Sequence, residues 1–141
     1  MIQDSTSEHD KDKLEQFIKF VSTKFGRKNE IIREIVNPYI TIIYSINRER
    51  KKDGFYIRLI EGKLGDFVQY KNGLYHGYSY HWYENGKKHV ESKFHMNAPD
   101  NYYTKWDQDG KILEVTRYES SFIKFSIELD DENSIERLQV R

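Results

Sequence analysis

The feature that most restricts the fold of this chain is a glycine that returns at a fixed interval. Gly62, Gly86 and Gly110 lie 24 residues apart, and each is followed by a lysine. Trp82 and Trp106 keep the same interval. A repeat of this length is typical of proteins in which each unit buries its apolar side only by stacking on its neighbours. We therefore expect a row of similar units that share one continuous core.

Asn-Gly and Asp-Gly pairs separate short segments that are rich in aromatic and β-branched residues. These pairs are Asp53-Gly54, Asn72-Gly73, Asn85-Gly86 and Asp109-Gly110. Both residue types accept a positive φ, which the type I′ turn of a tight antiparallel hairpin requires at its two central positions. The sequence therefore predicts an antiparallel β-meander, with strands at residues 39–46, 55–60, 67–70, 74–83, 88–96, 102–106, 112–118 and 122–129.

A different period precedes these strands. Leu14, Phe17, Ile18 and Val21 follow one another at the spacing of one helix face. Farther on, Pro38 and the β-branched residues around it are unsuited to a helix. The sequence thus predicts one helix at residues 11–26, packed on the sheet.

The length of the chain indicates a single domain over residues 1–141, of the α+β class and mainly β. We expect residues 1–10 to be a flexible N-terminus, residues 39–129 to form the antiparallel sheet, and residues 130–141 to be a last strand or a tail.

Composition argues against several functional classes. The chain has 23 basic and 23 acidic residues, so no long-range field steers it as a whole to nucleic acid or to an anionic membrane. It has no cysteine, which excludes disulfides, thiolate chemistry and Cys-ligated zinc. The polar first residues and the lack of a long apolar stretch lead us to expect a soluble, cytoplasmic protein.

One part of the repeat region resembles a known family. The stretch "YKNGLYHGYSYHWYENGKKHVESKFHMN", residues 70–97, is similar to the MORN-repeat variant of the YwqK-like antitoxin group. The residues on the motif positions are Gly73, Gly77, Trp82, Tyr83, Asn85 and Gly86. The resemblance extends over about residues 62–118 and implies MORN-like hairpin units and a partner protein that is neutralised. Asn97 and Asn101 replace the first two glycines in the following unit, and Ala98-Pro99 interrupts it.

The residue types that carry catalysis do not form a recognisable motif. His76, His81, His89 and His95 are candidate metal ligands or general bases, but none of their spacings matches a helical zinc motif. An exposed polar strand face accounts for them equally well. We therefore expect no enzymatic activity, no metal site and no cofactor.

Tyrosines are the best candidates for a binding surface. Tyrosine offers a large contact area and has few rotatable bonds to immobilise, which suits it to protein interfaces. The candidate anchors are Tyr75, Tyr78, Tyr80, Tyr83, Tyr102 and Tyr103. The sequence thus predicts a non-catalytic protein-interaction module, and the family resemblance implies an antitoxin-type or immunity-type role with a toxin as its partner.

The alternative is a phosphate-binding surface at the strongest basic run of the chain. Arg48, Arg50, Lys51 and Lys52 lie within the run "NRERKK", and tyrosines follow in the neighbouring strands. Cations interleaved with aromatic side chains suit single-stranded nucleic acid or phospholipid headgroups. The neutral net charge favours protein binding over this alternative.

Overall fold

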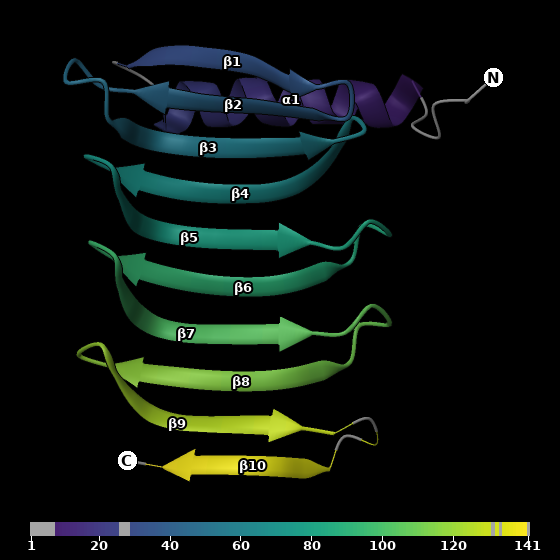
Figure 1. Ribbon diagram of the computed structural model, residues 1–141, viewed down its shortest axis with the longest axis vertical. Coiled ribbons are helices and arrows are strands. Elements are labelled where there is room, and N and C mark those ends of the chain that lie inside the picture. Colours follow the sequence, from purple (N-terminus) through teal and green to yellow (C-terminus); the bar gives the residue numbers. More distant parts are fainter. Residues whose placement is uncertain (1–7, 26–28, 131, 133, 141) are drawn as a thin grey trace.

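The computed structural model describes residues 8–25, 29–130, 132 and 134–140. In this part of the chain, ten strands form one antiparallel sheet in which the strands follow sequence order, and one helix lies against it (Figure 1). The elements are α1 (Glu8–Phe25), β1 (Glu30–Asn37), β2 (Ile40–Ile46), β3 (Lys52–Ile60), β4 (Lys63–Lys71), β5 (Leu74–Trp82), β6 (Lys88–His95), β7 (Ala98–Trp106), β8 (Ile112–Glu119), β9 (Phe122–Leu129) and β10 (Ile135–Val140). The predicted class, mainly β with one helix on an antiparallel meander, is confirmed.

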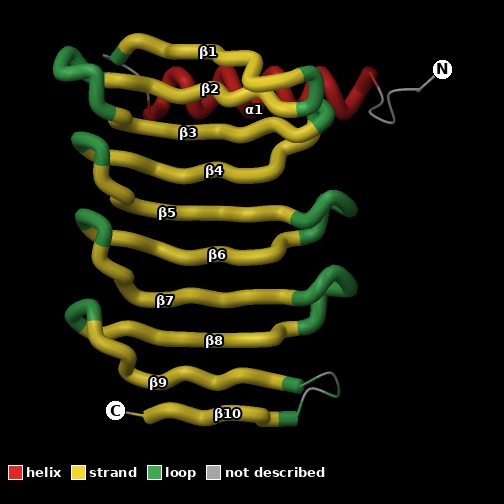
Figure 2. Tube along the Cα trace, viewed as in Figure 1, coloured by secondary structure: helices red, strands yellow, loops and turns green. Residues whose placement is uncertain are grey.

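The turns alternate between the two ends of the strands (Figure 2). At one end, the tight turns at Asn72-Gly73, Met96-Asn97 and Ser120-Ser121 each have positive φ at both central residues. These turns are 24 residues apart. The period in the sequence therefore corresponds to a unit of two strands and two turns.

The type I′ prediction is correct for Asn72-Gly73 and wrong for the other three pairs. At Asn85-Gly86 and Asp109-Gly110 only the glycine has positive φ. These turns are longer: Tyr83 N–H donates to Lys87 O at 2.9 Å and Gly86 N–H donates to Tyr83 O at 2.9 Å. Asp53-Gly54 lies inside β3, because the turn before it is closed earlier, with Arg50 at positive φ.

The hydrophobic core lies between α1 and one face of the sheet, which we call the helix face. Val21 of α1 packs with Ile43, Phe55 and Ile57, whose side chains are almost completely buried. Phe67 extends this core to β4, and Tyr80 and Trp82 of β5 pack partly buried against it. Alternate residues of the strands point to the other side of the sheet, which we call the opposite face. Among the described residues no helix covers the helix face of β6–β10 (Figure 1).

Several predicted boundaries differ from the structure. The helix begins at Glu8, so residues 8–10, which we expected to be flexible, are helical. Residues 1–7 and Gly26 lie outside the described residues. The sheet begins at β1 rather than at residue 39, because an additional strand precedes Pro38 and pairs with β2.

The C-terminal half also contains more strand than predicted. Pro99 lies near the start of β7 and pairs with Phe94, so the Ala98-Pro99 pair does not interrupt the sheet. A strand tolerates proline near its first residue, where a missing N–H costs little. In the segment 130–141, β10 pairs with β9 and forms a strand. No helix in the described part of the chain is long and apolar enough to cross a lipid bilayer.

Candidate functional site

The six candidate tyrosines do not form one surface. Tyr78, Tyr80 and Tyr102 lie on the helix face, and Tyr75 and Tyr103 lie on the opposite face, in accordance with strand alternation and register. Tyr83 lies in the β5–β6 turn, where its hydroxyl donates to Trp106 O at 2.8 Å and its ring stacks on His89 at 4.2 Å. Tyr83 therefore links neighbouring units rather than serving as an anchor.

A groove of about 440 Å³ lies on the helix face beside α1. Its wall comes from α1, through Phe17, Phe20, Val21 and Lys24, and its floor comes from β4 and β5. The floor residues are Leu64, Phe67, Gln69, Tyr78, Tyr80 and Trp82, and Lys88 of β6 borders it. The groove lies beyond the contact of Phe17 in α1 with Phe67 in β4, so it marks the point where the part of the helix face that α1 covers ends.

The aromatic rings of the groove form a continuous layer. Phe67 and Tyr80 stack with centroids 6.1 Å apart, and Tyr80 and Trp82 are 6.0 Å apart. Tyr78 and Tyr80 are nearly parallel, at 8° and 5.9 Å. Side chains at every second position of β5 thus present ring surfaces in a row, a geometry that strand alternation imposes. Tyr78 is 40% exposed, so part of this layer is accessible to a partner.

Basic side chains lie over these rings. Lys88 Nζ is 5.1 Å from the ring centroid of Tyr80, and Lys93 Nζ is 5.5 Å from that of Tyr78. Farther along the sheet, the Arg117 guanidinium lies 5.4 Å from the ring of Tyr102. Burial and the nearby carboxylate of Glu91 raise the pKa of the Tyr102 hydroxyl. The uncovered helix face therefore carries aromatic rings on β5 and β7 and basic side chains on the neighbouring strands β6 and β8.

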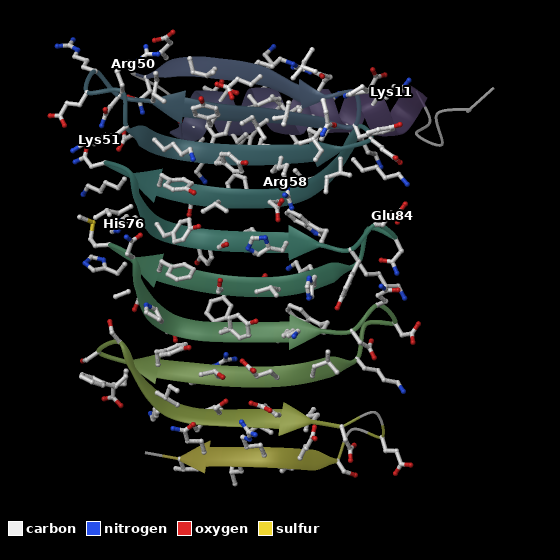
Figure 3. All side chains as sticks on the ribbon, in the orientation of Figure 1. Lys11, Arg50, Lys51, Arg58, His76 and Glu84 are labelled. Atoms are coloured by element: carbon white, nitrogen blue, oxygen red, sulfur yellow. The ribbon has the colours of Figure 1, made fainter. Side chains whose placement is uncertain are left out.

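The predicted basic run is divided by the structure (Figure 3). Arg50 pairs with Glu30 at 3.2 Å, and Lys51 pairs with Glu49 at 3.4 Å. Lys52 instead points to the opposite face and lies within 5.1–5.8 Å of three tyrosine rings, those of Tyr44, Tyr56 and Tyr70. Arg48 is exposed in the β2–β3 turn. The four basic residues thus do not form a single patch.

A polar cluster lies on the opposite face at the middle of β3–β5. Asp66 is buried between Arg58, with which it forms an ion pair, and His81, whose Nδ1 is 2.5 Å from its carboxylate. Burial alone would raise the pKa of Asp66, but the hydrogen bond from His81 and the charge of Arg58 outweigh burial and lower this pKa. The aspartate therefore remains charged while buried.

Ser79 completes a serine–histidine–aspartate chain, since its Oγ is 3.0 Å from His81 Nε2. The same residue types carry nucleophilic catalysis in serine hydrolases. Ser79 is only 4% exposed, however, and it pairs with Val68 on one side and Ser92 on the other. A substrate carbonyl cannot approach its Oγ, so we interpret this chain as a polar bridge between strands.

The remaining histidines do not converge on a metal site. His76 and His95 are in ring contact at 4.9 Å, and burial together with the charges of His95 and Lys71 lowers the pKa of His76. His89 stacks on Tyr83. Among the residues that the structure describes, no group of three or more His, Cys, Asp or Glu side chains is arranged to hold a metal ion.

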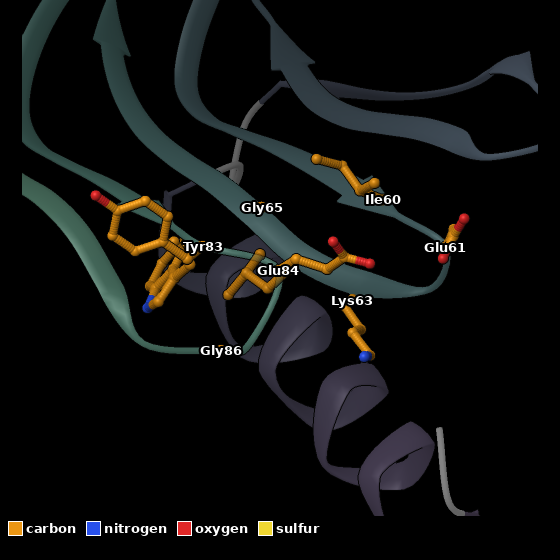
Figure 4. A pocket seen from close by; sticks show the side chains of 9 residues that line it. Ile60, Glu61, Lys63, Gly65, Tyr83, Glu84 and Gly86 are labelled. Carbon is orange, nitrogen blue, oxygen red and sulfur yellow. The ribbon is translucent and has the colours of Figure 1, made fainter. Parts of the chain in front are cut away.

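A second cavity, of about 370 Å³, adjoins the groove at the end of the strands. Figure 4 shows Tyr83 on one side of it and Glu61 and Lys63 on the other. Leu64 and Trp82 line both cavities, so the groove continues around this end of β4 and β5. This end of the combined cleft contains the carboxylates of Glu61 and Glu84 and the ammonium of Lys63, whereas the charged side chains of the groove beside α1 are the lysines Lys24 and Lys88.

Sequence reasoning identified the tyrosines but not the groove. Its helix wall depends on where α1 docks, and Phe20 was not among the residues of the predicted apolar helix face. A large apolar residue beside that face, such as Phe20 next to Phe17, was the available signal. Trp82 and Lys88 were also not selected as site residues.

Comparison with known proteins gives little further guidance. No family model matches the chain, and no curated protein matches it. Among solved structures, the crystal structure of TarM is 12% identical, with a TM-score of 0.37, over 89% of this chain and 22% of that chain. A variant of S. aureus TarM in complex with fondaparinux, α-GlcNAc-glycerol and UDP is 15% identical, with a TM-score of 0.34 over the same fractions. The chain thus spans about a fifth of these proteins, and the likeness is too distant to transfer a fold or an activity.

Proposed function

We propose that this chain is a non-catalytic, cytoplasmic protein-interaction module that binds a partner protein through the uncovered part of its helix face. Tyr78, Tyr80 and Tyr102, with the groove beside α1, form the binding surface. The strands are MORN-like hairpin units, and by resemblance to the YwqK-like antitoxin group the partner is a toxin or another protein that is neutralised. Of the six candidate tyrosines, these three are proposed as anchors.

The observation that supports this proposal is the partial cover of the sheet. The hydrophobic core under α1 extends over β2–β5, and the helix face then continues onto β6–β8, where Tyr102 of β7 lies against the Arg117 guanidinium, without a covering helix in the described part of the chain. Half-buried aromatic side chains contribute the most binding free energy when a partner covers them and excludes water. Exposed apolar patches of this kind, bordered by polar residues, are typical of protein interaction sites.

Two tyrosines on opposite faces provide a matched test. Tyr78 is 40% exposed on the helix face and Tyr75 is 42% exposed on the opposite face, so their truncation removes similar exposed areas. We expect the wild-type chain and the double variant Tyr75→Ala, Tyr103→Ala to capture the same protein from a native lysate of the source cells, and the double variant Tyr78→Ala, Tyr102→Ala to lose it. Capture of no protein above background by the wild-type chain, or equal loss in both variants, would contradict the proposal.

Phosphate binding remains the second candidate because of Lys52. Its Nζ lies over the rings of Tyr44, Tyr56 and Tyr70, an aromatic and cationic arrangement of the kind found in single-strand binding sites. A salt titration separates the two candidates. Phosphate contacts lose affinity steeply as salt rises, whereas binding to an aromatic protein interface changes little.

A further inference from the structure

The charged residues that line the groove beside α1 are basic. Lys24 contributes from the last turn of α1 and Lys88 from the start of β6, and no carboxylate belongs to the described lining of this groove. Lys93 adds a third cation, because its Nζ lies 5.5 Å from the ring of Tyr78. Glu91 is the neighbouring acid, and it pairs with Lys88 at 2.6 Å. The groove and its rim thus carry three lysines, Lys24, Lys88 and Lys93, and one neighbouring carboxylate, Glu91, which is a formal charge of +2.

The interior of the groove is apolar and has the volume of a side-chain pocket. Phe67, Tyr80 and Trp82 form its floor, and Phe20, which is 57% exposed, forms part of its wall. Its volume of about 440 Å³ lies within the range of roughly 300–1,000 Å³ that is usual for ligand clefts. An aromatic or leucine side chain that entered the groove would bury its own surface and also that of Phe20.

We propose that the groove binds an acidic segment of a partner protein, in which one large apolar side chain enters between Phe20 and Tyr80 and flanking carboxylates pair with Lys24, Lys88 and Lys93. This inference rests on the proposed protein-binding function and specifies the chemistry of the partner. The apolar anchor supplies most of the affinity. The basic rim selects against neutral and basic segments, since a like charge next to these lysines is unfavourable.

The adjoining cavity fixes the direction of the segment. Glu61, Glu84 and Lys63 line that cavity, so its two carboxylates exceed its single ammonium by one charge, and it meets the groove at Leu64 and Trp82 (Figure 4). Carboxylates of the partner are repelled from this end and attracted to the end with Lys24. The acidic residues that pair with Lys24 and Lys93 therefore lie at the end of the groove away from the β5–β6 turn, whereas Lys88, the first residue after that turn, lies beside Tyr80.

Selection of random short peptides on the folded full-length chain tests this chemistry without knowledge of the partner. We expect the enriched peptides to contain Phe, Trp or Leu next to two or more Asp or Glu residues. The most enriched peptide, labelled with fluorescein, is then titrated by fluorescence anisotropy against variants. Replacing Lys24, Lys88 and Lys93 by glutamine weakens binding about threefold for each lysine, and Phe20→Ala weakens it about tenfold.

Matched controls separate this outcome from general damage. The triple replacement of Lys71, Lys105 and Lys124 by glutamine changes the net charge equally outside the groove lining, and Phe122→Ala truncates a phenylalanine that is 62% exposed in place of one that is 57% exposed. We expect these controls to leave the affinity unchanged. Circular dichroism of every variant verifies that the sheet is intact.

Neutral or basic selected peptides, an empty selection, or equal losses in the groove variants and their controls would each overturn the inference. The proposed function fails separately. If a cellular partner is lost in the Tyr78→Ala and Tyr102→Ala variant but is unaffected by the three lysine replacements, the interaction surface stands and only the acidic partner chemistry is wrong.

Discussion

Gly77 on β5 provides the strictest test of the geometry around the groove. Its φ is +109°, a conformation that residues with a Cβ rarely adopt. A Cβ added here would be 2.2 Å from Oε1, 2.9 Å from Cδ and 3.1 Å from Cβ of Gln69. That Oε1 accepts a hydrogen bond from Tyr78 N–H at 2.7 Å. Gly77→Ala therefore forces an unfavourable backbone conformation and displaces Gln69 from this hydrogen bond.

The cost of this substitution follows from the two effects. A non-glycine residue in a sparsely populated backbone region costs about 1–3 kcal/mol, and the lost hydrogen bond costs about 1 kcal/mol. We expect Gly77→Ala to lower the free energy of unfolding by about 2–4 kcal/mol and the Tm by roughly 10 °C for a chain of this size. Gly86 and Gly110 also have positive φ, but no atom lies within 4 Å of an added Cβ. Their alanine variants should show the backbone cost alone.

Urea unfolding, followed by tryptophan fluorescence, measures these differences. A double-mutant cycle isolates the side-chain contribution, because Gly77→Ala should cost about 1 kcal/mol less when Gln69 is already alanine. Gln69 and Tyr78 line the groove, so Gly77→Ala should also weaken binding of the acidic peptide. Equal destabilisation by Gly77→Ala and Gly86→Ala, with no coupling to Gln69, would refute the reasoning.

Three further predictions concern the core and the titrating groups. Phe55→Ala should lower the free energy of unfolding by about 3–5 kcal/mol in urea, because this side chain is completely buried. Asp66 has a lowered pKa, so its stabilising effect is present above the pKa of the unfolded carboxyl and is lost as the pH falls below about 4; urea unfolding of Asp66→Asn should show lower stability at neutral pH and a smaller loss on acidification. The hydroxyls of Tyr70 and Tyr102 have raised pKa values, chiefly because of burial. They should ionise last in an alkaline titration followed by tyrosinate absorbance, and stability should fall as the pH rises above about 10.

The repeat in the sequence predicted the order of the strands because turn chemistry and strand order are local properties. The helix was also predicted within three residues at its start, because Ile18 and Val21 fall on one face and are buried there. The first strand was not predicted, since its burial is low and its charged residues leave no clear alternation. Local patterns thus specified the meander but not its first edge.

The division of the tyrosines between two faces was available in the sequence but was not used. Tyr102 and Tyr103 are adjacent in one strand, so they must point to opposite faces. Tyr75 and Tyr78 lie on either side of Gly77, where a positive φ and a register shift in the β4–β5 pairing interrupt the regular strand. The position of the groove, by contrast, depends on the docking of α1 on distant strands. No local pattern in the sequence contains that information.

The uneven distribution of the core connects stability with binding. The most buried apolar side chains belong to α1 and β2–β4, whereas the buried centres of β6 and β8 are Ser92 and Thr116, which contribute little apolar area. Because the strands from β6 onward bury little apolar area and pair only with their sequence neighbours, we expect them to open most easily, beginning at the β10 edge. A partner seated on Tyr78 and Tyr102 would cover the helix face of β5–β7 and bind only the paired form of these strands. Its binding free energy would therefore add to their stability, and strands that are less stable in the free protein would become ordered in the complex.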